Sequence, residues 1–176
     1  AFSDCVNLES VSIPGSVTHI AKFAFSDCEN LESVYIPESV TNIAYRAFDC
    51  CKNLESVFIP GSVNKIDERA FCGCSNLISV NIGDGVQCIR DSAFAGCTKL
   101  SSIVIPNSVT KIGDSAFDGC ENLVSVALGN GLKNIGNGAF WGCKKLTLFE
   151  TNSPLDVNSF CFDYRTRPYI LTSKRP

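Results

Sequence analysis

The stretch "AFSDCENLESVYIPESVTNIAYR", residues Ala24 to Arg46, is one copy of a unit that builds the whole chain. An Ala-Phe pair recurs at a constant interval without insertions, a cysteine follows each phenylalanine by three residues, and a leucine follows each cysteine by three more. Self-similarity at a fixed period indicates a stacked repeat protein, whose fold is worked out per repeat. The pairs begin at Ala1, Ala24, Ala47, Ala70, Ala93, Ala116 and Ala139.

Each repeat contains the pattern of a short strand. From Leu31 to Ile36 the sequence runs Leu-x-x-Val-x-Ile. Val34 and Ile36 are two apart, as inward-facing strand residues are, whereas Ser33 and Tyr35 face the opposite side. A proline or a glycine then ends the strand in the first six copies, because proline cannot donate to a strand ladder.

A single repeat is too small to bury its own apolar side chains, so neighbouring repeats must stack. Stacking pairs the equivalent strands in a parallel sheet and predicts an elongated solenoid. The Ala-Phe-x-x-Cys segment is expected to form one or two helical turns. Asp91 or Asp114 stands just before this segment in two copies and is expected to cap it.

The full pattern, Leu-x-x-Val-x-Ile-Pro-x-Ser-Val-x-x-Ile-x-x-x-Ala-Phe-x-x-Cys-x-x-Leu, resembles the BspA-type leucine-rich repeat of bacterial and protozoan surface proteins. This resemblance implies a right-handed leucine-rich-repeat superhelix of seven 23-residue coils. A parallel β-sheet would line its concave face and short helical or 3₁₀ turns its convex face. It also implies a cell-surface or secreted protein that adheres to host or extracellular-matrix proteins without enzymatic activity.

The regular pattern covers residues 1–150, and residues 151–176 depart from it. The next Ala-Phe slot holds Phe162 and Asp163, and the nearest small-then-aromatic pair is Ser159-Phe160. We interpret residues 151–176 as a degenerate repeat that serves as a C-terminal cap, with a strand near Tyr169 to Leu171. The chain lacks methionine and begins inside a repeat, which favours a piece of a longer protein.

Composition argues against several classes of partner. No run of 18 apolar residues is present, so no membrane insertion is expected in this segment. The net charge is −3 and the isoelectric point about 5.1, which disfavours nucleic-acid binding. The charge is uneven, with a net −6 in residues 1–88 and +3 in residues 89–176. The basic end of the chain is interpreted as a solvated tail.

The seven in-phase cysteines are interpreted as buried thiols, because they lie between phenylalanine and leucine columns and free cysteine is a strongly buried residue type. Stacked side chains keep their Cβ atoms about 4.8 Å apart, beyond the usual disulfide separation, and they do not converge as zinc ligands must. Among the out-of-phase cysteines, Cys50 and Cys72 are the candidate disulfide, and Cys88 lies in an exposed column. The in-phase column is Cys5, Cys28, Cys51, Cys74, Cys97, Cys120 and Cys143.

The residues needed for catalysis are scarce. His19 is the only histidine and lies in a polar surface column, so no Ser-His or Cys-His pair can form elsewhere. The Gly-x-Gly segments occupy turn positions and do not form a phosphate loop. We therefore expect no enzyme, no cofactor and no metal.

The outward-facing strand positions supply a candidate protein-contact surface. One outward column is serine in six consecutive repeats, a uniformity typical of stacking or hydration. The next column varies and includes Tyr35 and Phe58 on consecutive coils, bordered by Glu9, Glu32 and Glu55. Exposed aromatic side chains with an acidic border favour contact with a basic protein segment.

Two alternatives remain open at this point. Tyr35 and Phe58 could simply pair across strands. The chain could also be a structural spacer or stalk segment of a larger surface protein with no ligand of its own, and its oligomeric state is open.

Overall fold

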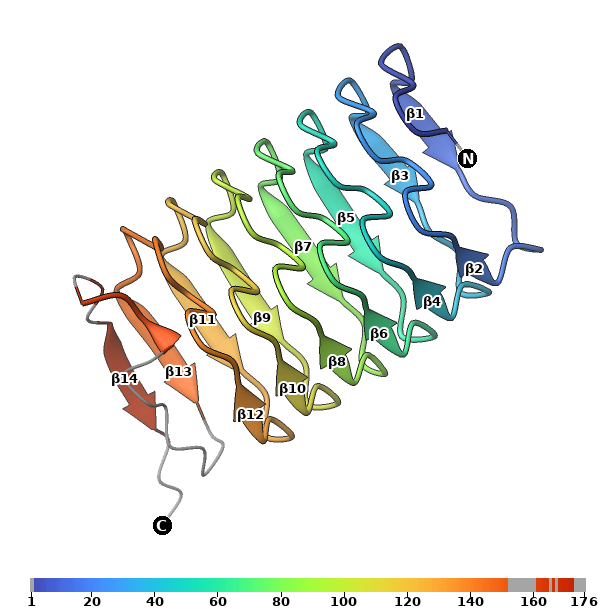
Figure 1. The fold of residues 1–176 in the computed structure, drawn as a ribbon. Helices are drawn as coiled ribbons and strands as arrows, with labels where there is room; N and C mark the ends of the chain where they lie inside the picture. The colour runs from blue at the N-terminus through green and yellow to red at the C-terminus, as the bar shows by residue number, and fades with distance from the viewer. Residues whose placement is uncertain (1, 152–160, 165, 167, 173–176) are drawn as a thin grey trace.

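The computed structural model describes residues 2–151, 161–164, 166 and 168–172. These residues form a solenoid of about seven turns, in which each turn corresponds to one repeat of the sequence and lies beside the next (Figure 1). The predicted leucine-rich-repeat solenoid with a parallel sheet is confirmed. Two rows of strands run along it, one of longer strands and one of two-residue strands.

The longer strands form parallel sheets in the order β1-β3-β5-β7 and β9-β11-β13-β14 (Figure 1). Pairing joins residues one repeat apart, as in Val57 with Val80. Inward and outward residues alternate along β5 and β9, where the burial pattern is exposed, buried, exposed, buried. The strands are β1 (Ser10–Ser12), β3 (Ser33–Tyr35), β5 (Ser56–Ile59), β7 (Ser79–Ile82), β9 (Ser102–Ile105), β11 (Ser125–Leu128), β13 (Leu148–Thr151) and β14 (Tyr169–Thr172).

A separate parallel sheet of six short strands runs along another side of the coils. Each strand ends in an isoleucine that is buried, so this sheet closes the other side of the core. The strands are β2 (His19–Ile20), β4 (Asn42–Ile43), β6 (Lys65–Ile66), β8 (Cys88–Ile89), β10 (Lys111–Ile112) and β12 (Asn134–Ile135).

The core consists of stacked columns with one side chain of each kind per coil. The phenylalanines of the Ala-Phe pairs lie face to face, with centroids of consecutive rings 5.1 to 5.5 Å apart and interplanar angles of 1 to 8°. Such offset stacking is favourable for aromatic pairs. The rings from Phe48 to Phe140 are completely buried, so the phenylalanine column extends through the solenoid and reports its coil-to-coil spacing.

The expectation of helical or 3₁₀ turns on the convex side is wrong for residues 2–151, where no helix forms. Two residues per coil have positive φ, such as Arg46 at 53° and Cys50 at 58°, and they interrupt any helix. The backbone N–H groups also bond to the next coil, as in Phe48 N to Ala70 O at 2.8 Å and Cys50 N to Cys72 O at 2.7 Å. These donors are therefore unavailable for the bonds of a helix.

Asp91 and Asp114 do not cap their own turns, so that prediction is also wrong. The Asp91 Oδ1 atom accepts from the backbone N–H of Asp114 at 3.0 Å, and Asp114 Oδ1 accepts from that of Asn137 at 2.8 Å. Each carboxylate thus reaches across to the next coil. Glycine precedes the receiving residue at Gly113 and Gly136, where a Cβ atom would collide with the carboxylate and with backbone atoms.

At the C-terminal end, β14 pairs in parallel with β13, with Leu148 opposite Tyr169. This strand lies where one was expected, near Tyr169 to Leu171. Cys161 and Phe162 take the place of the Ala-Phe pair: the Cys161 carbonyl accepts from Phe140 N at 2.9 Å, and the Phe162 ring stacks on Phe140 at 5.9 Å. The small-then-aromatic pair Ser159-Phe160 lies outside the described residues. Residues 152–160 of the proposed C-terminal cap are likewise not described.

Candidate functional site

The outward side chains of the longer strands form one surface, which we call the strand face. Tyr35 on β3 is 61% exposed and Phe58 on β5 is 48% exposed. They hold the same repeat position on neighbouring strands, which pair through Ser33 and Ser56. No ring contact joins Tyr35 to Phe58 among the residues that the structure describes, so the two rings do not stack on each other.

Glu9, Glu32 and Glu55, which we call the acidic column, lie just before β1, β3 and β5. All three are exposed. Backbone bonds hold them in line, from Glu32 N to Glu9 O at 2.8 Å and from Glu55 N to Glu32 O at 3.3 Å. No ion pair involves these three carboxylates within the described part of the chain. Their negative charges therefore add along one edge of the strand face.

Three further apolar side chains lie on this face between β5 and β11, and none of them was among the candidates. Ile78 is 50% exposed, Val104 67% and Val124 43%. Ile78 and Val124 take the place of the glutamates in later coils, and Val104 takes that of Tyr35. A comparison along the repeats would have found Ile78 and Val124, because apolar residues replace glutamate in that column. With Tyr35 and Phe58 they make up what we call the apolar strip.

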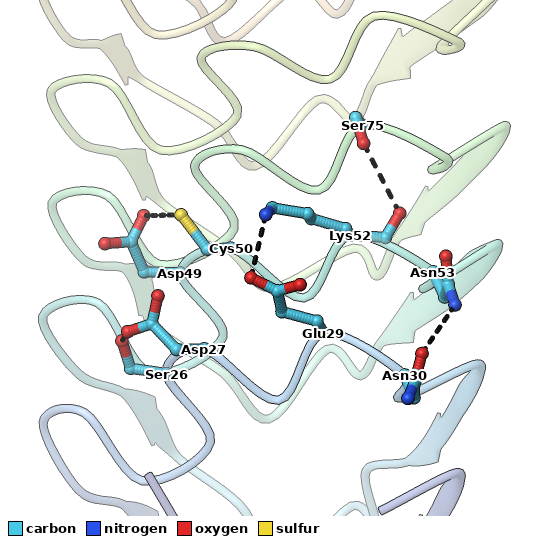
Figure 2. Close-up of polar contacts among 9 residues, drawn as sticks. All are labelled: Ser26, Asp27, Glu29, Asn30, Asp49, Cys50, Lys52, Asn53 and Ser75. Carbon is cyan, nitrogen blue, oxygen red and sulfur yellow. Dashed lines mark hydrogen bonds and ion pairs between the residues drawn. The ribbon is translucent and has the colours of Figure 1, made fainter. Parts of the chain in front are cut away.

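The turn segments that precede the longer strands are joined by contacts between neighbouring coils (Figure 2). The Lys52 ammonium and the Glu29 carboxylate lie 2.7 Å apart, and Asn53 donates to Asn30 at 3.1 Å. Asn76 continues this ladder by donating to Asn53 at 3.1 Å. Polar groups on this side thus satisfy one another from coil to coil, unlike the acidic column.

The in-phase cysteines are structural. Six of them are buried, and Cys5 is half-buried. Each buried thiol donates to the carbonyl of the phenylalanine 26 residues earlier, as in Cys74 Sγ to Phe48 O at 3.2 Å, with Sγ···O distances of 3.0 to 3.3 Å in the column. The sequence pattern indicates the burial but not this hydrogen bond. Burial raises the pKa of the Cys51, Cys74 and Cys143 thiols, which keeps them protonated and poorly nucleophilic.

The candidate disulfide between Cys50 and Cys72 is not present, and both residues are free thiols. The Cys50 thiol donates to the Asp49 Oδ1 atom at 3.9 Å (Figure 2), and the negative charge of Asp49 adds to the effect of burial on the pKa of Cys72. The Cys50 Sγ also lies over Gly73, 3.2 Å from where a Cβ atom would be. The Cys50 sulfur is therefore placed by contacts other than an S–S bond. Burial raises the pKa of Cys72 to about 11.

The remaining candidate groups do not assemble into a reactive centre. His19 is exposed, and its Nδ1 lies 2.8 Å from the Thr18 hydroxyl. Cys88, expected to be exposed, is half-buried between Lys65 and Lys111 in the short-strand sheet. Among the described residues, no group of three or more His, Cys, Asp or Glu side chains is arranged to hold a metal ion. In the same residues, no helix has the length and apolarity to cross a membrane.

An apolar hollow of about 340 Å³ lies at the N-terminal end of the solenoid. It is lined by Phe2, Val11, Ile13 and Phe25, among others. Within the array this side of each coil is covered by the neighbouring coil. The hollow is therefore the end of the core columns and is distinct from the strand face.

The chain belongs to the BspA type leucine rich repeat region family, whose model matches residues 1–102 and 87–172 in six copies. It is similar to a solved leucine rich repeat protein of T. pallidum, with 33% identity and a TM-score of 0.64, over 82% of this chain and 59% of that one. A leucine-rich repeat protein of Eubacterium ventriosum is 25% identical with a TM-score of 0.67, over 76% of this chain and 42% of that one.

The pneumococcal vaccine antigen PcpA is 15% identical with a TM-score of 0.51, over 95% of this chain and 64% of that one, and shares the fold. No curated protein is a significant match. The chain spans less than two thirds of the length of each of these solved structures. Membership of the repeat family is consistent with a protein-interaction module.

Proposed function

We propose that the chain is a non-catalytic protein-binding module of a cell-surface or secreted protein, and that it binds a host or extracellular-matrix protein through the strand face. The observation that carries the proposal is the apolar strip. Between β3 and β11, five large apolar side chains are 43 to 67% exposed on this one face, while the core columns beneath are buried. Exposed apolar side chains gathered on one surface favour protein contact.

Two further observations support the proposal. The acidic column borders the aromatic part of the strip, which adds a charge preference for a basic partner. The BspA-type family, to which the chain belongs, supports a location at the cell surface or outside the cell.

The test compares binding of three purified proteins to a panel of matrix proteins and to host-cell surface proteins by biolayer interferometry. The variant Tyr35→Ser/Phe58→Ser removes both aromatic rings from the strip. Trp141→Ser is the matched control, because Trp141 is 50% exposed but lies in the turn segment after the seventh Ala-Phe pair. We expect the double variant to lose about tenfold or more in affinity and the control to bind as the wild type. A folded double variant with unchanged binding would contradict the proposal.

A spacer role is the second candidate, favoured by the backbone hydrogen bonds that join consecutive coils along residues 2–151. A spacer needs only stacking and no contact surface. It predicts that deleting two complete repeats from the whole surface protein reduces attachment, whereas Tyr35→Ser/Phe58→Ser leaves it unchanged. The binding proposal predicts instead that Tyr35→Ser/Phe58→Ser reduces attachment.

A further inference from the structure

Three parallel columns on the strand face define the shape of a partner, if the face binds a protein as proposed above. The acidic column forms one edge, and Tyr35 and Phe58 lie along the other. Between them runs a column of serines, whose side chains are small. It comprises Ser10, Ser33, Ser56, Ser79, Ser102 and Ser125. Each of the three columns therefore runs along the solenoid axis with one residue per coil.

The coil-to-coil spacing is close to the pitch of an α-helix. Paired strands on the face lie about 4.8 Å apart, and the core rings beneath lie 5.1 to 5.5 Å apart. An α-helix rises about 5.4 Å per turn, so a helix lying across the strands places about one turn on each coil. An extended peptide repeats its side chains at intervals of about 6.6 Å and falls out of step within two coils.

The width of the surface also matches a helix. Tyr35 is the third residue after Glu32, and at about 3.3 Å per residue this offset gives about 10 Å between the two columns. An α-helix with its side chains is about 10 to 12 Å across. A helix lying over the serines would thus contact the glutamates on one side and the aromatic rings on the other.

Charge selects the kind of helix. The three exposed glutamates occupy three consecutive coils, or about two helical turns, which correspond to residues i, i+3 or i+4, and i+7 of a helix. Beyond β5 the same column becomes apolar at Ile78 and Val124. The complementary helix therefore carries basic residues along one stripe and apolar residues beside and beyond it.

We propose that the strand face binds a basic amphipathic α-helix of a partner protein, lying across β1, β3, β5 and β7. Its Lys or Arg residues contact Glu9, Glu32 and Glu55, and its apolar residues contact Tyr35, Phe58 and Ile78. The repeats of a second copy do not supply the helix, because residues 2–151 contain none. The occupant that we propose is a helical basic segment of a different protein.

The test uses synthetic peptides as probes, measured by fluorescence anisotropy at low and at high salt. The first is a hydrocarbon-stapled helix of about 18 residues, or about five turns, with Lys at i, i+4 and i+7 and Leu and Phe on the adjoining stripe. The second has the same composition but two central prolines that prevent a helix. The third is the stapled helix with Glu in place of Lys.

We expect only the first peptide to bind, with an affinity that falls as salt is added. The variant Glu9→Gln/Glu32→Gln/Glu55→Gln should bind it about tenfold more weakly, and Tyr35→Ser/Phe58→Ser should do the same. The matched control Glu38→Gln/Glu68→Gln/Glu121→Gln removes the same charge from exposed positions off the strand face and should bind as the wild type.

Three outcomes overturn the inference. Equal binding of the proline peptide would show that the face does not select a helix, although protein binding by the face would stand. Binding of no peptide, or binding that the acidic-column and control variants weaken equally, would also refute it. The interferometry with matrix proteins tests the proposed function separately, so the two failures are distinguishable.

Discussion

Replacing Cys74 tests how the cysteine column stabilises the solenoid. The Cys74 side chain is completely buried, and its thiol donates to the Phe48 carbonyl at 3.2 Å. That carbonyl also accepts from the Cys51 N–H at 3.4 Å, so removing the thiol does not leave it unpaired. The Cys74→Ala substitution therefore loses the packing of one sulfur atom and one weak hydrogen bond, and we expect it to lower the free energy of unfolding by about 1 to 2 kcal/mol.

The Cys74→Ser substitution separates packing from hydrogen bonding. A serine hydroxyl can donate to the Phe48 carbonyl in place of the thiol, whereas a buried hydroxyl without an acceptor costs about 1 to 3 kcal/mol. We expect the serine and alanine variants to agree within about 0.5 kcal/mol. Urea unfolding followed by circular dichroism measures the difference, with Cys88→Ala at a half-buried position as the control. A serine variant that is less stable than the alanine variant by about 1.5 kcal/mol or more would refute the hydrogen-bonding role.

Three other predictions concern thiols, pH and backbone packing. Burial raises the pKa of Cys72 to about 11, so the rate of its labelling by iodoacetamide in the native protein should still increase at pH 10, where the rate for an ordinary thiol is level. Mass mapping measures the rate, and a plateau near pH 9 would contradict the prediction. Burial raises the pKa of the Asp49 carboxyl despite the Arg46 guanidinium, so the folded state binds its proton more readily. The stability of the wild type relative to Asp49→Asn should therefore increase as pH falls through the ordinary aspartate range near 4, and urea unfolding at several pH values that found a decrease would overturn this sign. A Cβ atom at Gly113 would collide with Asp91 and with backbone atoms, so Gly113→Ala should lower the free energy of unfolding by about 2 kcal/mol or more. A variant that melts at the same temperature as the wild type would contradict this close approach.

The periodicity of the sequence was sufficient to predict the solenoid, because stacking requires equal coils and the repeat interval contains no insertion. The Leu-x-x-Val-x-Ile pattern predicted the longer strands, and β3 (Ser33–Tyr35) lies within it. The helical turns were wrong because a backbone N–H can bond within its own turn or to the next coil, and only the stacked structure decides between these. The sequence did contain a signal against a helix. In later repeats glycine occupies the position of Cys50, and this position has positive φ.

The candidate surface was predicted in part. Alternation along the strand placed Tyr35 and Phe58 outward, and both are exposed. Ile78 and Val124 were missed because they lie just before the strands, where the two-residue alternation does not apply. Cys50 and Cys72 are free thiols in the structure, because proximity on adjacent coils does not fix the direction of a thiol, and the Cys50 thiol donates to Asp49 instead.

Site-directed photo-crosslinking tests the use of the strand face most directly. A benzophenone amino acid is placed at Phe58, on the strand face, or at Lys111, on the exposed side of the short-strand sheet. After incubation with intact host cells and with matrix proteins, illumination should give a protein adduct from the first position and none from the second. Adducts of equal yield at both positions, or from Lys111 alone, would contradict binding through the strand face.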